Sequence, residues 1–277
     1  MRRVRSSIVL VVLMVFISAT AWAGVQEMAD ALAAADAANK PVPVLSKSAP
    51  DMDAKTAYAV QKVYVAQRTA KAGIGGFKGG LTTEGGQKRF GVNAPLSGVL
   101  YAAGKLEGSP VVDRKDFRGL MLETEIGFVI GQAIAQPVKD VAELQQKVSG
   151  VMPAIELPEM AFDDMKALKG VDIIAADVGA AKYIVGQTRP HKGLDLNEIK
   201  VALTMDGQPV NQGQGKDALG DQWKAALWLV NTVVEQGYKI EPGQVLMTGA
   251  LGNMIPGKPG KYVADYGAFG KIAFEVK

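Results

Sequence analysis

Three glutamates are the residues of this chain best suited to chemistry. Glu123 and Glu125 stand two positions apart within Leu122–Gly131, and Glu156 follows in Pro153–Glu156. Apolar residues alternate with the first two glutamates, which is the period of a β-strand, so both carboxylates are expected on one face, about 7 Å apart. Neighbouring carboxylates on an apolar strand repel each other and lose hydration, so a positive charge should lie between them. Oxygen ligands of this kind suit a hard divalent cation such as Mg²⁺ or Mn²⁺.

The first 23 residues have the layout of a cleavable secretory signal peptide. Three arginines precede an apolar run over residues 8–17, and Ala21-Trp22-Ala23 is a small-x-small cleavage site. The apolar run is short for a membrane span, and the chain turns polar directly after Ala23, which argues against the alternative of an uncleaved anchor. We therefore expect a periplasmic or secreted protein, cleaved near Ala23, with one domain over residues 24–277 and no membrane association after cleavage.

Charge and composition exclude several classes of function. The chain has 31 Lys and Arg against 28 Asp and Glu, but three of the arginines lie in the signal segment, so the remainder is formally neutral. This balance gives no electrostatic reason to expect nucleic acid as a partner. The chain has no cysteine and one histidine, which excludes thiol nucleophiles, cysteine zinc sites, iron–sulfur clusters and multi-histidine metal sites.

Hydrophobic periodicity indicates an α+β fold in which short strands are mixed with a few helices. Helices are expected over residues 25–39, from Asp51 or Asp53 to Arg68, from Asp140 to Val148, and from Asp221 to Gln236. Strands are expected over residues 122–130, 171–177, 183–185, 200–205, 208–210, 245–248 and 271–276. Asp206-Gly207 predicts a type I′ hairpin turn. The glycine-rich stretch 73–86 indicates either a close backbone approach or a flexible loop.

Five motifs occur in order along nearly the whole chain after Ala57. They are Lys78–Val92, Glu123–Gly131, Pro153–Glu156, Trp228–Asn231 with Gly237, and Pro242–Gly249. The set, with 33 positions from Glu123 to Glu156, resembles the 2-keto-4-pentenoate hydratase and 4-oxalocrotonate decarboxylase branch of the fumarylacetoacetate hydrolase superfamily. The resemblance implies a homo-oligomer with a mixed β-roll of the fumarylacetoacetate hydrolase C-terminal-domain type over residues 111–277. A helical and glycine-rich N-terminal part over residues 24–110 would precede the roll.

The same resemblance assigns roles to individual residues. It implies a Mg²⁺ or Mn²⁺ ion held by Glu123, Glu125 and Glu156, and it places Lys78 at the catalytic lysine of the family. Thr82, in the same motif as Lys78, and Thr248, in a strand-end Thr-Gly that resembles the rim of the family's pocket, are candidate substrate-binding residues. The implied activity is that of a metal-dependent lyase, a hydratase or decarboxylase, which acts on small 2-oxo or 2-hydroxydienoic acids through a metal-stabilised enolate.

Two motifs of the family are altered in this chain. Ala102 and Ala103 replace an Asp-Asp pair, and Val178 and Ala180 replace an Asn and a Ser, so the hydrogen bonds of those side chains are lost. Lys182 is a candidate to supply charge to the substrate instead. These changes leave alternative functions open. The chain could be a periplasmic oxo-acid binding protein that keeps the metal site but has lost turnover, or it could be a tautomerase or an oxaloacetate decarboxylase.

Overall fold

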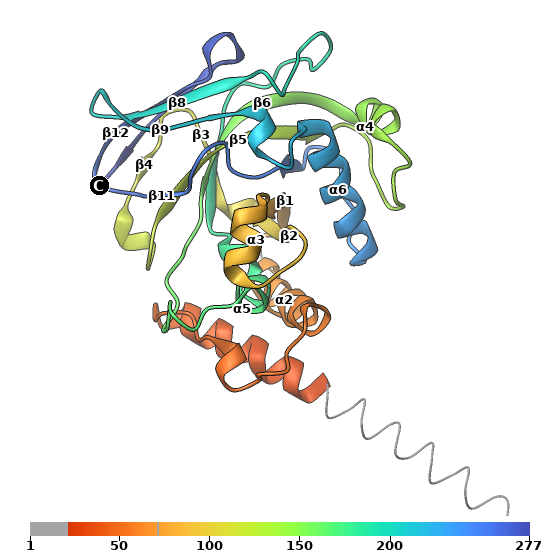
Figure 1. The fold of residues 1–277 in the computed structure, drawn as a ribbon, viewed down its shortest axis with the longest axis vertical. Coiled ribbons are helices and arrows are strands. Elements are labelled where there is room, and N and C mark those ends of the chain that lie inside the picture. The colour runs from red at the N-terminus through yellow and green to blue at the C-terminus, as the bar shows by residue number, and fades with distance from the viewer. Residues whose placement is uncertain (1–21, 71) are drawn as a thin grey trace, which may run out of the picture.

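A curved mixed sheet occupies the centre of the molecule (Figure 1). The computed structural model describes residues 22–70 and 72–277, so the signal segment expected over residues 1–23 lies outside the described residues except for Trp22 and Ala23. The strands of this sheet run in the order β2-β1-β10-β5-β6-β7-β3, with β11 paired to β5. Their bounds are β1 Ile74–Gly80, β2 Leu96–Tyr101, β3 Lys105–Glu107, β5 Met121–Ile130, β6 Val148–Leu157, β7 Lys182–Val185, β10 Val245–Met247 and β11 Ile255–Pro256.

A second sheet packs against the first and contains the C-terminus. Its order is β4-β13-β12-β8-β9. The bounds are β4 Val111–Val112, β8 Lys200–Met205, β9 Gln208–Gln214, β12 Gly260–Asp265 and β13 Lys271–Val276. Asp206 and Gly207 have φ angles of 51° and 79°, so the left-handed turn predicted for the β8–β9 hairpin is confirmed.

Aspartates begin three of the predicted helices. The helices are residues 22–37, α2 Ala54–Thr69, α3 Glu84–Phe90, α4 Val141–Lys147, α5 Gly170–Ala175 and α6 Gln222–Glu235. Asp53, Asp140 and Asp221 each accept a hydrogen bond from the backbone N–H three residues further on, as an N-cap does. The predicted starts of α2, α4 and α6 are therefore confirmed.

The strand predicted over residues 171–177 is wrong. The structure forms helix α5 there, followed by a short turn over Asp177–Gly179. Asp172 accepts a hydrogen bond from the Lys169 N–H and so closes the first turn of α5. A short apolar run that is buried all round has the same sequence pattern in a helix as in a strand, so periodicity could not separate the two.

The expected α+β class and mixed β-roll are confirmed by this architecture. The boundary that we placed between residues 110 and 111 crosses the large sheet, because β1, β2 and β3 precede it and β5, β6 and β7 follow it. The glycine-rich stretch contains β1. At Gly76 a side chain would collide with the Val245 carbonyl of the neighbouring strand β10, which is the close backbone approach that its glycines permit.

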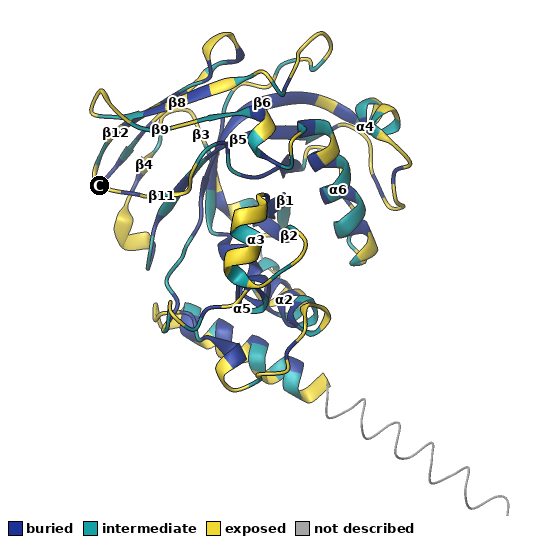
Figure 2. Ribbon diagram, viewed as in Figure 1, coloured by how far each residue is buried: buried dark blue, intermediate teal, exposed yellow. Residues whose placement is uncertain are grey.

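Burial differs sharply between these elements (Figure 2). Strands β5 and β6 are buried along most of their length, whereas no residue of α3 is buried. Within residues 22–70 and 72–277, none of the helices combines the length and hydrophobicity that a membrane crossing requires. The site residues on β5 and β6 are therefore held by strands that are largely protected from solvent.

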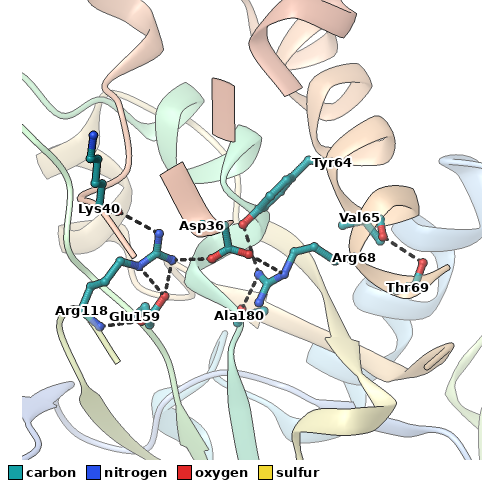
Figure 3. Close-up of polar contacts among 9 residues, drawn as sticks. All are labelled: Asp36, Lys40, Tyr64, Val65, Arg68, Thr69, Arg118, Glu159 and Ala180. Carbon is teal, nitrogen blue, oxygen red and sulfur yellow. Dashed lines mark hydrogen bonds and ion pairs between the residues drawn. The ribbon is translucent and has the colours of Figure 1, made fainter. Parts of the chain in front are cut away.

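An ion-pair network joins the N-terminal helix to the rest of the fold (Figure 3). Asp36, near the end of helix 22–37, lies 3.0 Å from the Arg118 guanidinium and 3.3 Å from that of Arg68 on α2. Arg118 also pairs with Glu159, just after β6. Arg68 donates to the Ala180 carbonyl, which follows the Asp177–Gly179 turn. One carboxylate thus connects the first helix to α2 and to the loops at the ends of β5 and β6.

We expect Asp36→Ala to lower the free energy of unfolding by about 2 kcal/mol, because two partly buried arginines lose a hydrogen-bonded counter-charge. Asp30→Ala is the matched control on the same helix, since Asp30 is exposed and its partners among the described residues are the neutral amides of Gln26 and Gln67. Urea denaturation measures both variants. Equal losses in the two variants would contradict a structural role for the network.

Candidate metal centre

Strands β5 and β6 bring the three predicted glutamates together. Glu123 lies directly opposite Glu156 in the β5–β6 ladder, and Glu125 is two residues further along the same face of β5. One carboxylate oxygen of each glutamate lies within 4.8 Å of the corresponding oxygens of the other two. The strand period placed the first two side chains on one face, and the register of the ladder adds the third.

Burial makes this cluster electrostatically unfavourable without a cation. Glu125 and Glu156 are fully buried, and Glu123 is half-buried. Burial, and then the charge of Glu156, raises the pKa of Glu123 to about 8 and that of Glu125 well above its usual range. Among the described residues, Glu125 Oε1 and both oxygens of Glu156 lack a hydrogen-bond donor, apart from an ion pair with Lys78. Unpaired buried carboxylate oxygens that converge on one point fit a hard divalent cation.

Lys78 supplies the positive charge that lies closest to this cluster. It extends from β1, is 2% exposed, and places its Nζ 2.6 Å from Glu156 Oε1. The Nζ also donates a hydrogen bond of 2.9 Å to the Val178 carbonyl. Burial alone would lower the pKa of Lys78, but Glu156 and Glu123 reverse that effect and raise it. The amine therefore stays protonated inside the site.

A strained turn holds the Val178 carbonyl against Lys78. Asp177, Val178 and Gly179 have φ angles of 54°, 52° and 69°, all in the left-handed region. A β-branched residue is a genuine outlier there, and such strain is typical of functional sites. Asp177 fixes the turn by accepting the Val99 N–H at 2.8 Å, and burial raises its pKa to about 7. Position 178 thus contacts Lys78 through its backbone oxygen.

The two predicted threonines lie on the Glu125 side of the cluster. Thr248 donates a hydrogen bond of 2.6 Å to Gln222, the first residue of α6. The next residue, Gly249, donates its N–H to Glu125 Oε2 at 2.7 Å. A side chain at Gly249 would collide with Thr82, so this glycine allows Thr82 to pack against the strand end. Gln222 was missed from the sequence, because its pattern indicates only the first turn of a helix, and Gly249 was included there only as part of the motif Pro242–Gly249.

The structure does not bring Lys182, the remaining predicted site residue, to this cluster. Its ammonium pairs with Asp116 at 2.6 Å and lies over the Phe117 ring. Tyr183 is the residue opposite Glu156 in the β6–β7 ladder, so Lys182 points to the other face of the sheet. The sequence alone could not reveal this register.

The metal-free protein should lose stability as the pH rises from about 4.5 to about 8. The folded protein keeps a proton on Glu123 in this range, whereas the unfolded chain releases it, so the free energy of unfolding falls with rising pH. The raised pKa values of Glu125 and Asp177 act in the same direction. Denaturation across this pH range with a chelator present measures the effect. Glu123→Gln should flatten the profile, and a wild-type stability that rises over the range would contradict the prediction.

Known proteins share both the sequence pattern and the fold. Residues 94–276 match the fumarylacetoacetate (FAA) hydrolase C-terminal family. The 2-keto-4-pentenoate hydratase of Paraburkholderia xenovorans (strain LB400) is 31% identical over 237 residues, which cover 85% of this chain and 88% of that protein. The 4-oxalocrotonate decarboxylase of Pseudomonas sp. (strain CF600) is 26% identical over 221 residues, which cover 79% of this chain and 83% of that protein.

Solved structures agree at the level of the fold. The 4-oxalocrotonate decarboxylase from Pseudomonas putida G7, complexed with magnesium and adipate, superposes with a TM-score of 0.85 at 23% identity and covers 91% of this chain and 97% of that one. The fumarylpyruvate hydrolase from Pseudomonas aeruginosa, in complex with Mn²⁺ and pyruvate, gives 0.56 at 11% identity and covers 72% and 88%. Because the family match spans most of the chain and a hydratase relative exceeds 30% identity, this protein belongs to the fumarylacetoacetate hydrolase C-terminal family.

Proposed function

We propose that this chain is a divalent-metal-dependent lyase, a hydratase or a decarboxylase, that acts on small 2-oxo or 2-hydroxydienoic acids. The observation that carries the proposal is the meeting of three glutamates with Lys78 in one buried site. Relatives named as hydratases and decarboxylases support the reaction class. Fold neighbours complexed with magnesium, calcium or Mn²⁺ support a divalent ion, for which we propose Mg²⁺ or Mn²⁺.

Four residues of the chain would carry the proposed reaction. Glu123, Glu125 and Glu156 would hold the ion, whose bound form would polarise the 2-oxo group as a Lewis acid. Three carboxylates would leave ligand positions on such an ion for substrate and water. Lys78 donates one hydrogen bond to the Val178 carbonyl and forms an ion pair with Glu156, so its ammonium keeps donor capacity for the substrate or for a proton transfer.

Loss of one glutamate should weaken the metal site. We expect Glu123→Gln to bind Mg²⁺ or Mn²⁺ at least about 10-fold more weakly than the wild type, because a neutral amide replaces a ligand carboxylate. Glu107→Gln is the control, since Glu107 is exposed and pairs with Lys105. Isothermal titration measures both variants, and unchanged affinity in Glu123→Gln would count against the site.

The alternative is a binding protein that keeps the metal site without turnover. The alanines at 102 and 103 favour it, because they form a short turn at the end of β2 where the resemblance calls for two acids. The retained Lys78 favours the enzyme. Loss of the dienol absorbance of 2-hydroxypenta-2,4-dienoate, followed with metal-loaded protein, separates the two. Binding without decay of the absorbance supports the binding protein.

If the protein is the proposed lyase, the two lysines should respond differently to substitution. Lys78→Met should lower turnover by at least about 100-fold, the scale expected for a lost proton-transfer group. Lys182→Met should leave turnover nearly unchanged, since its ammonium is engaged with Asp116 on the other face of the sheet. Steady-state kinetics on both variants checks this, and equal losses would contradict the assignment of Lys78.

We also propose that the chain is exported, cleaved near Ala23 and assembled as a homo-oligomer. The basic and apolar start of the sequence supports export, and the family resemblance supports assembly. N-terminal sequencing of protein from the periplasmic fraction tests the first point. Light scattering on the purified protein tests the second.

A further inference from the structure

A tyrosine of the C-terminal sheet reaches between the two strands that hold the glutamates. Tyr266 joins β12 to the turn before β13, and its side chain is 3% exposed. Its hydroxyl accepts a hydrogen bond from the Glu125 N–H at 3.2 Å and donates one to the Ala154 carbonyl at 2.7 Å. Glu125 and Ala154 are opposite each other in the β5–β6 ladder. The phenol therefore bridges the two strands beside a candidate metal ligand.

The ladder geometry shows where this contact lies. Along an antiparallel strand, the backbone N–H and C=O groups of successive residues point alternately toward the partner strand and away from it. The Pro153 carbonyl accepts from the Gly186 N–H, which lies on the β7 side, so the adjacent Ala154 carbonyl points toward β5. The Tyr266 hydroxyl thus contacts both members of this pair at the point where the Ala154 carbonyl faces β5. The position of Glu125 depends on a residue from the other sheet.

Glu125 is fixed at two points and free at a third. Tyr266 holds its main chain, and the Gly249 N–H holds its Oε2 at 2.7 Å. Its Oε1 is buried and has no hydrogen-bond donor among the described residues. A ligand that is already immobilised in this way loses little further freedom when a cation binds, and partners behind metal ligands commonly determine affinity.

We propose that Tyr266 is a positioning residue for the metal centre. It sets the main-chain position of Glu125, and through it the direction in which Oε1 faces the ion. The inference rests on the proposed metal site and adds to it a structural dependence of that site on the C-terminal sheet. Tyr266 itself is not assigned as a ligand.

Tyr262 provides a matched control. It is also buried on β12, its ring stacks on Phe274, and its hydroxyl both accepts from and donates to the Lys258 main chain, at 3.0 and 2.9 Å. Replacing either tyrosine with phenylalanine removes one buried hydroxyl and two main-chain hydrogen bonds. Only Tyr266 adjoins a glutamate of the cluster.

The test compares Tyr266→Phe with Tyr262→Phe by calorimetric titration of Mn²⁺ and by the electron paramagnetic resonance spectrum of the bound ion. We expect Tyr266→Phe to weaken Mn²⁺ binding by about 10-fold or more and to change the spectrum. We expect Tyr262→Phe to lose a similar amount of thermal stability while keeping the wild-type affinity and spectrum. Wild-type affinity in Tyr266→Phe, or an equal loss in both variants, would overturn the proposal.

The outcomes also separate this inference from the proposed function. If the wild-type protein binds no Mn²⁺, the metal site itself fails. If the wild type and both variants bind equally, only the role of Tyr266 fails. Should Tyr266→Phe not fold, Phe269→Leu serves as the second variant, because Phe269 packs edge-on against the Tyr266 ring. It should weaken Mn²⁺ binding, and unchanged affinity would again overturn the proposal.

Discussion

Repulsion among three closely spaced carboxylates, two buried and one half-buried, is the constraint on which the rest of this site depends. Glu123, Glu125 and Glu156 converge in a place that solvent hardly reaches, and two of them have raised pKa values as a consequence. One ammonium, that of Lys78, lies among them at 2.6 Å from Glu156. A single positive charge cannot neutralise three negative ones, so the arrangement favours either bound protons or a divalent cation.

Hydrogen bonds from several parts of the chain fix the charged side chains of this cluster. A left-handed turn presents the Val178 carbonyl to Lys78. The Gly249 N–H holds one oxygen of Glu125, and the Tyr266 hydroxyl holds its main chain. These groups come from both sheets and from the loops between them. A site assembled in this way is rigid, because moving any one ligand requires a shift in a different part of the chain.

The N-terminal helix is connected to the same region through charged side chains. Asp36 contacts Arg68 and Arg118, and Arg68 lies over the Tyr101 ring and donates to the Ala180 carbonyl. Ala180 follows the turn that carries Val178. The first helix of the described residues is thus linked through Asp36, Arg68 and Ala180 to the turn that binds Lys78. This link gives the N-terminal segment a structural connection to the site as well as to the core.

The sequence alone determined the local features of this protein. Its strand period placed Glu123 and Glu125 on one face, its aspartates began three helices, and its ordered motifs indicated the family and the mixed roll. Tertiary structure decided which distant groups meet. The β5–β6 register brought Glu156 opposite Glu123, and the β6–β7 register turned Lys182 away. Helix α5 replaced a predicted strand, and Tyr266 arrived from another sheet. Local periodicity fixes the face on which a side chain lies, whereas only strand register and packing fix what lies opposite that face.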